Sequence, residues 1–207
     1  MISLPRLYAI LDPSCFPNRE LMLNTASQWV NAGVMLLQYR NKSGHAKAML
    51  AEAHAISRTR SPERGKIKLI MNDRADLCLA AEFDAVHVGQ DDLSPESVRK
   101  IIGSSRWLGV STHNPEQVAE ADQTSADYIA IGPIFATASK ANPDPVVGVE
   151  GVRRARLLTS KPLVAIGGIT RQNCQSAIDA GADSVAVISD LVREPAKSVE
   201  EFLSILG

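Results

Sequence analysis

The segment QYRNK at residues 38–42 brings together side chains that could bind a phosphate group. Its members Gln38, Arg40 and Lys42 occupy alternate positions, and alternate side chains of an extended chain project to the same side. An amide and two cations would then face one ligand. A simpler explanation stays open, in which Arg40 and Lys42 merely reach solvent where a strand ends.

Two carboxylates follow, Asp73 in the segment NDR at 72–74 and Asp92 in VHVGQDD at 86–92. At neighbouring strand ends they would form a partial shell for Mg²⁺, which takes one or two protein carboxylates and completes its octahedron with water and substrate phosphate. Asp73 could instead cap a helix N-terminus. His87 is predicted either to line a substrate or to be a hydrogen-bonded core residue.

A second set of residues suits a separate phosphate. Thr137, Ser139 and Lys140 supply two hydroxyls and an ammonium in a long irregular stretch, and loops of that length are often functional. Gly168 and Ser189 stand where two further apolar runs end. Because glycine lets backbone amides approach an anion, we expect a phosphate site there. A surface loop with incidental polar residues remains the alternative for the first three.

Each of these polar sets follows a short apolar run rich in valine, isoleucine and leucine. Most of the runs are continuous rather than alternating, which is typical of strands buried on both faces of a parallel sheet. We predict eight strands, at residues 7–11, 35–39, 67–71, 85–88, 108–111, 128–131, 163–166 and 184–188.

Segments with helical spacing lie between the predicted strands. In one of them a single stripe holds Ala46, Met49, Leu50, Ala53 and Ile56. Eight such alternations in 207 residues predict an α/β protein with one domain over the whole chain, a (β/α)8 TIM barrel with its active site at the carboxyl ends of the strands. An open doubly wound sheet remains the alternative, because periodicity does not report closure.

The composition narrows the classes of partner. Lysine plus arginine (22) nearly balances aspartate plus glutamate (23), so we expect neither nucleic acid nor a membrane surface as partner. No apolar stretch approaches the roughly 18 residues of a membrane span, and the start of the chain lacks a signal peptide's pattern. We therefore predict a cytoplasmic protein. Cys15, Cys78 and Cys174 lack metal or redox spacing and are predicted to be free thiols.

Seven motifs occur in an order typical of one family. They are QYRNK at 38–42, NDR at 72–74, VHVGQDD at 86–92, GVSTH at 109–113, GPIFATASK at 132–140, AIGGI at 165–169 and VAVIS at 185–189. With these motifs the chain resembles thiamine phosphate synthases. The match runs from Leu7 to about Ser189 and so covers nearly the whole chain.

The resemblance implies an enzyme with two small-molecule substrates. It would join 4-amino-2-methyl-5-hydroxymethylpyrimidine diphosphate to a thiazole phosphate, 4-methyl-5-(2-phosphoethyl)thiazole or its carboxylated form, and release pyrophosphate. The family's metal ligands fall on Asp73 and Asp92, which would hold Mg²⁺. Arg40, Lys42 and Lys140 would be the catalytic cations that meet the leaving group. Whether the protein forms a homo-oligomer is left open.

The substrate contacts implied by the resemblance fall into two groups. Those to the pyrimidine diphosphate are Gln38, Arg40, Lys42, Asn72, Ser111 and Lys140. Those to the thiazole phosphate are Thr137, Ser139, Gly168, Ile188 and Ser189.

The chain departs from the family's pattern at a few positions. Leu11 replaces a usual threonine, Asn41 replaces a common glutamate, and Ala136 and Ser139 stand where proline and a second threonine are frequent. No charge is lost from the implied diphosphate site. Three alternatives stay open: a thiazole tautomerase of the same fold, a noncatalytic phosphate-sensing barrel, and a phosphosugar isomerase barrel.

Overall fold

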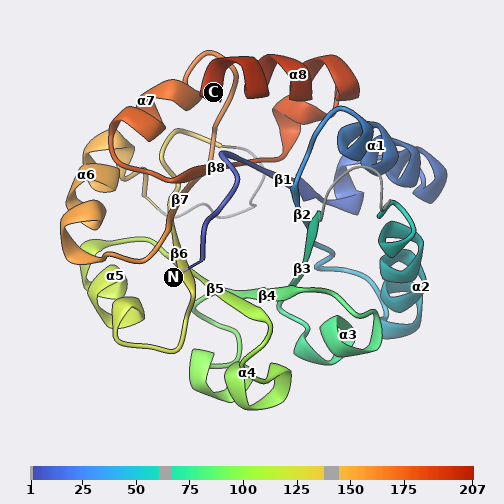
Figure 1. The fold of residues 1–207 in the computed structure, drawn as a ribbon, viewed down its shortest axis with the longest axis horizontal. Helices are drawn as coiled ribbons and strands as arrows, with labels where there is room; N and C mark the ends of the chain where they lie inside the picture. Colours follow the sequence, from blue (N-terminus) through green and yellow to red (C-terminus); the bar gives the residue numbers. More distant parts are fainter. Residues whose placement is uncertain (1, 61–66, 138–144) are drawn as a thin grey trace.

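The computed structural model describes residues 2–60, 67–137 and 145–207. Eight strands pair in chain order, all parallel, and β8 pairs with β1, so the sheet is a closed barrel (Figure 1). This confirms the predicted (β/α)8 fold and excludes the open sheet. The strands are β1 (Leu7–Leu11), β2 (Leu36–Tyr39), β3 (Lys68–Asn72), β4 (Ala85–Val88), β5 (Trp107–Thr112), β6 (Tyr128–Ile131), β7 (Leu163–Ile166) and β8 (Ser184–Val187).

Helices form a ring outside the barrel (Figure 1). Among the described residues they are α1 (Arg19–Asn31), α2 (Ala46–Ser57), α3 (Ala75–Ala80), α4 (Pro95–Ile102), α5 (Pro115–Asp122), α6 (Gly148–Leu158), α7 (Cys174–Asp179) and α8 (Pro195–Leu206), with 3-10 turns η1 (Pro13–Cys15) and η3 (Ser189–Leu191). The N-cap residues of α1, α4 and α5 are Asn18, Ser94 and Asn114. Each of these side chains accepts a hydrogen bond from a backbone N–H in the first turn of its helix, which fixes where the helix starts.

The predicted stripe of α2 is largely correct. Met49, Ala53 and Ile56 are buried and Leu50 is half-buried. Ala46, however, is exposed, because the buried stripe begins only at Met49, one turn further into the helix.

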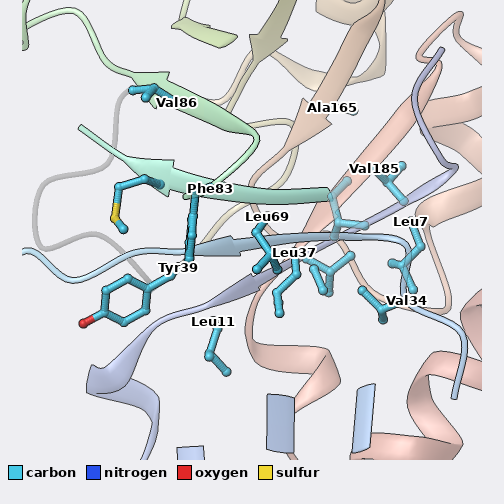
Figure 2. Close-up of a cluster of buried hydrophobic side chains, with 14 of the residues drawn as sticks. Leu7, Leu11, Val34, Leu37, Tyr39, Leu69, Phe83, Val86, Ala165 and Val185 are labelled. Carbon is cyan, nitrogen blue, oxygen red and sulfur yellow. The ribbon is translucent and has the colours of Figure 1, made fainter. Parts of the chain in front are cut away.

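Two apolar layers explain why the strands read as continuous apolar runs. Side chains at alternate positions, such as Leu7, Leu37 and Leu69, point outward and pack under the helices (Figure 2). Their neighbours, such as Tyr8 and Ile70, belong to a second cluster inside the barrel. Both faces of each strand are therefore buried, as a parallel barrel requires.

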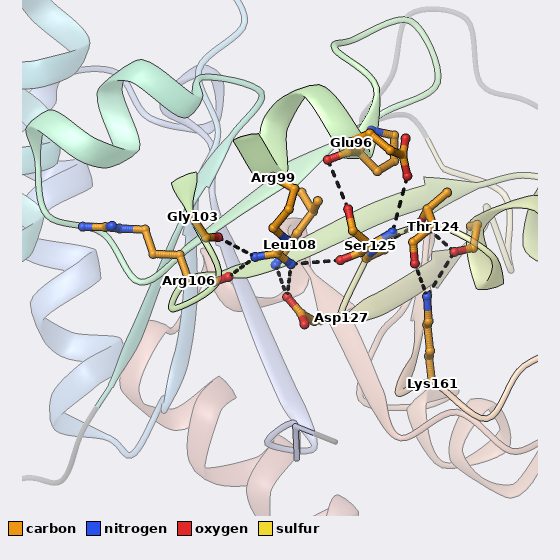
Figure 3. A network of polar contacts seen from close by, with 12 residues as sticks. Glu96, Arg99, Gly103, Arg106, Leu108, Thr124, Ser125, Asp127 and Lys161 are labelled. Atoms are coloured by element: carbon orange, nitrogen blue, oxygen red, sulfur yellow. Dashed lines mark hydrogen bonds and ion pairs between the residues drawn. The ribbon is translucent and has the colours of Figure 1, made fainter. Parts of the chain in front are cut away.

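A recurring carboxylate joins the strands in pairs at their N-terminal ends. Asp127, just before β6, accepts the backbone N–H of Leu108 in β5 at 2.7 Å and the Arg99 guanidinium at 2.6 Å (Figure 3). Arg99 also donates to the carbonyl oxygens of Arg106 and Ser125. The same arrangement occurs before β4 and β8, where Asp84 binds Leu69 N–H and Arg60, and Asp183 binds Leu163 N–H and Arg156. We call these three contacts the N-terminal clamps.

Two further expectations concern the chain as a whole. In the part that the structure describes, no helix is both long and apolar enough to span a membrane. Cys15, Cys78 and Cys174 are free thiols, the first half-buried and the other two buried, as predicted.

The clamp at Asp127 should contribute measurably to stability. Asp127→Ala leaves the N–H of Leu108 and the Arg99 guanidinium without their carboxylate, so we expect a loss of about 2 kcal/mol in the free energy of unfolding. Urea denaturation measures this loss. Glu150→Ala is the control, because it removes an exposed pair with Arg153 on α6 and should cost about 0.5 kcal/mol or less. Equal losses in the two variants would contradict a special role for the clamp.

Candidate active site

The carboxyl ends of the strands surround a cavity of about 540 Å³. Every strand, or the loop after it, contributes to the lining. Eleven of the predicted site residues line it: Gln38, Arg40, Lys42, Asn72, Asp73, Asp92, Ser111, Thr137, Gly168, Ile188 and Ser189. The other two, Ser139 and Lys140, lie outside the described residues. The structure thus brings together side chains from both predicted polar sets.

Arg40 is held by a carboxylate that sequence reasoning missed. Its guanidinium forms an ion pair with Asp12, which follows β1 and is 5% exposed. The other oxygen of Asp12 accepts the Ser14 hydroxyl at 2.7 Å and the Ser14 N–H at 3.0 Å. Asp12 therefore cannot turn away without losing several hydrogen bonds, so the Arg40 guanidinium is anchored at the rim rather than extended into solvent.

Asp73 adopts an unusual backbone conformation. Its φ angle is +61°, in the left-handed region that residues with a side chain seldom occupy. The N-cap of α3 is Arg74, without a side-chain capping bond, so capping does not explain Asp73. Its Oδ2 instead accepts the Lys42 ammonium at 2.5 Å. Strained residues of this kind cluster at functional sites.

Asp73 and Asp92 lie close enough to share a proton. Burial raises the pKa of the Asp73 carboxyl, and its hydrogen bond with Asp92 adds to this rise against the opposing effect of Lys42. Burial also works against ionisation of Asp92, yet its pKa is lowered, because its carboxylate accepts hydrogen bonds from Asp73 and from the N–H of Gly89. The pair therefore loses its first proton at low pH, and removal of the second proton, from Asp73, is unfavourable because it places two negative charges side by side.

This donor set fits a divalent cation that also binds a ligand. Two adjacent carboxylates repel each other, and a cation would replace the shared proton. The Nδ2 atom of buried Asn72, which lines the same cavity, has no hydrogen-bond partner. No cluster of three or more His, Cys, Asp or Glu side chains able to bind a metal occurs in residues 2–60, 67–137 and 145–207. A cation here would need water or ligand oxygens to complete its shell.

The floor of the cavity is lined by neutral polar groups, which Tyr128 connects through hydrogen bonds although it does not line the cavity itself. Gln38 donates to the Tyr8 hydroxyl at 2.6 Å, and the hydroxyls of Tyr8 and Tyr128 are 3.0 Å apart. His87 bridges Tyr128, 3.0 Å from Nδ1, and Ser111, 2.8 Å from Nε2. Burial lowers the pKa of His87 to about 4, so the imidazole is neutral near pH 7.

The floor includes two tyrosines that sequence reasoning missed. Both lie inside apolar runs and read as core residues, although their inward positions in β1 and β6 could have indicated them. Gly109 makes room for the group, because a Cβ atom there would lie 2.1 Å from the Tyr128 ring and 2.5 Å from His87 Nδ1. His87 is the hydrogen-bonded, buried residue of one prediction, and it also lines the cavity, so that contact with a substrate stays a prediction.

The opposite rim is formed by backbone rather than by charge. Gly168 has a φ angle of +64°, and a Cβ atom on it would lie 2.5 Å from the carbonyl oxygen of Ala136. Asn173, which does not line the cavity, donates from its Nδ2 atom to the Gly168 carbonyl at 2.9 Å and so stabilises this turn. Ile188 and Ser189 line the cavity beside it. A glycine in this position lets the main chain approach a bound anion closely.

Comparisons with known proteins agree on one family. The family model described as thiamine monophosphate synthase matches residues 7–191. A thiamine-phosphate synthase of Koribacter versatilis is 57% identical, over 99% of this chain and 97% of that protein. One from Shouchella clausii is 40% identical over 90% of this chain and 88% of its own length.

One solved structure agrees with the sequence relatives, and a second shares only the fold. Thiamine phosphate pyrophosphorylase from Pyrococcus furiosus superposes with a TM-score of 0.85 at 28% identity, covering 97% of this chain and 95% of that one. A phosphoribosyl anthranilate isomerase from Thermus thermophilus, with a TM-score of 0.68 and 14% identity over 98% of both chains, shares the fold alone.

The burial of His87 leads to a prediction about the protonation of its imidazole. In the unfolded chain an imidazole titrates near pH 6.5, whereas His87 in the folded protein has a pKa of about 4. Between these values the unfolded state binds a proton that the folded state does not, so the free energy of unfolding should fall as the pH falls through this range. NMR titration of the metal-free protein, with His87→Asn to assign the signal, measures this pKa. A folded-state pKa of 6.5 or higher would contradict the neutral floor.

Proposed function

The chain belongs to the thiamine monophosphate synthase family, and from that premise we propose that it joins a hydroxymethylpyrimidine diphosphate to a thiazole phosphate and releases pyrophosphate. Thiamine-phosphate synthases are transferases, and identity of 57% over nearly the whole chain places this protein among them. The substrates are 4-amino-2-methyl-5-hydroxymethylpyrimidine diphosphate and 4-methyl-5-(2-phosphoethyl)thiazole or its carboxylated form.

The observation that carries this proposal is the division of one cavity into two unlike rims. Cations and paired carboxylates stand after β2, β3 and β4, where they suit a diphosphate with a metal ion. Glycine backbone and a hydroxyl stand after β7 and β8, where they suit a single phosphate. Two phosphate-bearing substrates held at these rims would meet over the neutral floor.

The cationic rim would stabilise the leaving group. When the bond between the pyrimidine methylene and the diphosphate oxygen breaks, negative charge grows on the departing pyrophosphate. Arg40, anchored by Asp12, and Lys42 lie where they can meet that charge without moving far. Lys140 completes the predicted set as a third cation.

The paired carboxylates supply a metal site for the same step. Asp73 and Asp92 would hold Mg²⁺, which when bound neutralises charge on the diphosphate oxygens. Lys42 pairs with Asp73 in this structure, and once Asp73 binds the cation, the Lys42 ammonium could bind the diphosphate instead. The Nδ2 atom of Asn72, which has no partner, would donate a hydrogen bond to the same anion. A tautomerase, which ionises no diphosphate, has no need for this carboxylate pair.

The neutral floor suits the other product of bond breaking. Positive charge develops on the pyrimidine methylene, and a charged imidazole nearby would oppose it. His87 is neutral, and Gln38 offers an amide that can bind the polar edge of the aminopyrimidine. The thiazole nitrogen, positioned by its phosphate at Gly168 and Ser189, would attack directly, so proximity replaces a protein nucleophile.

An assay with both substrates and Mg²⁺ tests the proposal. We expect pyrophosphate release that depends on both substrates together. Release of pyrophosphate without the thiazole phosphate would indicate a hydrolase instead. Conversion of the thiazole phosphate alone, with no pyrophosphate from the complete mixture, would indicate the tautomerase.

The metal role makes a separate prediction. Asp92→Asn removes one of the two carboxylates, so the Mg²⁺ concentration for half-maximal turnover should rise by about 10-fold. Asp76→Asn is the control, because it removes an exposed carboxylate that pairs with Arg74 and does not line the cavity, so it should change this concentration less than about two-fold. An unchanged Mg²⁺ requirement in Asp92→Asn would remove Asp92 from the metal site.

A further inference from the structure

An arginine outside the cavity ties together the two loops that form the backbone rim. Arg171 lies in the loop after β7, and its Nε and Nη2 atoms both donate to the Asp190 carboxylate in η3, each at 3.1 Å. The backbone N–H of Arg171 donates to the same carboxylate at 2.8 Å. A further guanidinium nitrogen pairs with Glu201 on α8. The pair is partly shielded, since 20% of the Arg171 side chain and 18% of the Asp190 side chain are exposed.

The contacts between Arg171 and Asp190 lie beyond the end of the β7–β8 pairing, where no ladder hydrogen bonds join the two loops. The pairing of β7 with β8 ends with Ile166 opposite Ala186. Beyond that point Gly168 and Ser189 diverge from the ladder and line the cavity. Arg171 comes three residues after Gly168, and Asp190 directly follows Ser189. The ion pair is therefore placed to set the spacing between the two lining segments.

The first of these segments is also held on its other side. The carbonyl oxygen of Gly167 accepts the N–H of Phe135 at 3.0 Å, which joins it to the loop after β6. Asn173 fixes the Gly168 carbonyl from behind. The three hydrogen bonds between Arg171 and Asp190 restrain movement of this segment toward or away from η3.

We propose that Arg171 and Asp190 are positioning residues for the monophosphate of the thiazole substrate, an inference that rests on the proposed function. Neither side chain lines the cavity, and the charge of Arg171 is already balanced by two carboxylates. The pair acts through geometry: it holds the loop that carries Gly168 against the turn that carries Ser189, and both residues line the cavity. A shift of about 1 Å in such groups is enough to cost a large factor in binding or rate.

The same two strands carry a matched control at their other end. Arg156 pairs with Asp183 at 3.0 Å, and Asp183 accepts the N–H of Leu163 in β7 at 2.8 Å. This N-terminal clamp joins β7 to β8 as the Arg171 pair does, but it lies at the end of the barrel away from the cavity. Asp183→Asn should thus lower stability without changing the affinity for either substrate.

The test compares steady-state kinetics for both substrates in the wild type, Asp190→Asn, Arg171→Ala and Asp183→Asn. We expect KM for the thiazole phosphate to rise by about 10-fold in the first two variants, while KM for the pyrimidine diphosphate changes by less than about two-fold. The double variant Arg171→Ala/Asp190→Asn should raise this KM by much less than the product of the two single effects, because both substitutions remove the same side-chain ion pair. Gly168→Ala, which obstructs the rim directly, should raise the same KM.

The outcomes separate this inference from the function it rests on. A wild type that does not couple the two substrates overturns the proposed function and the inference together. An active wild type whose two KM values rise equally in Asp190→Asn, or stay unchanged, overturns only the positioning role. Thermal unfolding of each variant completes the comparison, and a failure of both Arg171→Ala and Asp190→Asn to fold would show the pair to be structural and overturn its positioning role as well.

Discussion

The pairing of β8 with β1 is the constraint on which the rest of the molecule depends. Because all strands are parallel and the sheet closes, every carboxyl end reaches the same rim, and residues from Tyr8 to Ser189 line one cavity. An open sheet would leave the loops after β1 and β8 at opposite edges. Closure also buries both faces of every strand, which is why an aliphatic, alanine-rich sequence with few aromatic residues can form this fold.

The site gathers charge at one rim and avoids it elsewhere. Arg40 and Lys42 are each paired with an aspartate, and the contact between Asp73 and Asp92 raises the pKa of Asp73 while it lowers that of Asp92. The floor, in contrast, consists of neutral groups that satisfy one another through Tyr8, Tyr128 and His87. Such a gradient orients a polar ligand before any reaction begins, since the anionic end of the ligand has only one favourable direction.

Much of this could be predicted from the sequence, and the limits have a physical cause. Strands β1, β4, β6 and β7 occur at the predicted bounds, because buried parallel strands have a strong local signal. Gln38, Asp73 and Gly168 were predicted to face the cavity because each ends a strand or follows one directly. The pairs Asp12 with Arg40 and Arg171 with Asp190 were not, because contacts between distant segments depend on the register of neighbouring strands, which no local pattern contains.

The N-terminal clamps divide the barrel into modules. Asp84, Asp127 and Asp183 each join an odd-numbered strand to the even-numbered strand that follows, and the equivalent place before β2 holds Met35 instead. Three quarters of the barrel therefore carry their own closing carboxylate. The natural unit for circular permutation of this chain is then the two-strand quarter together with the helix before it, because a cut between β4 and α4 leaves Arg99, Leu108 and Asp127 on one segment. A cut between β5 and β6 separates the Leu108 N–H from Asp127 in the chain.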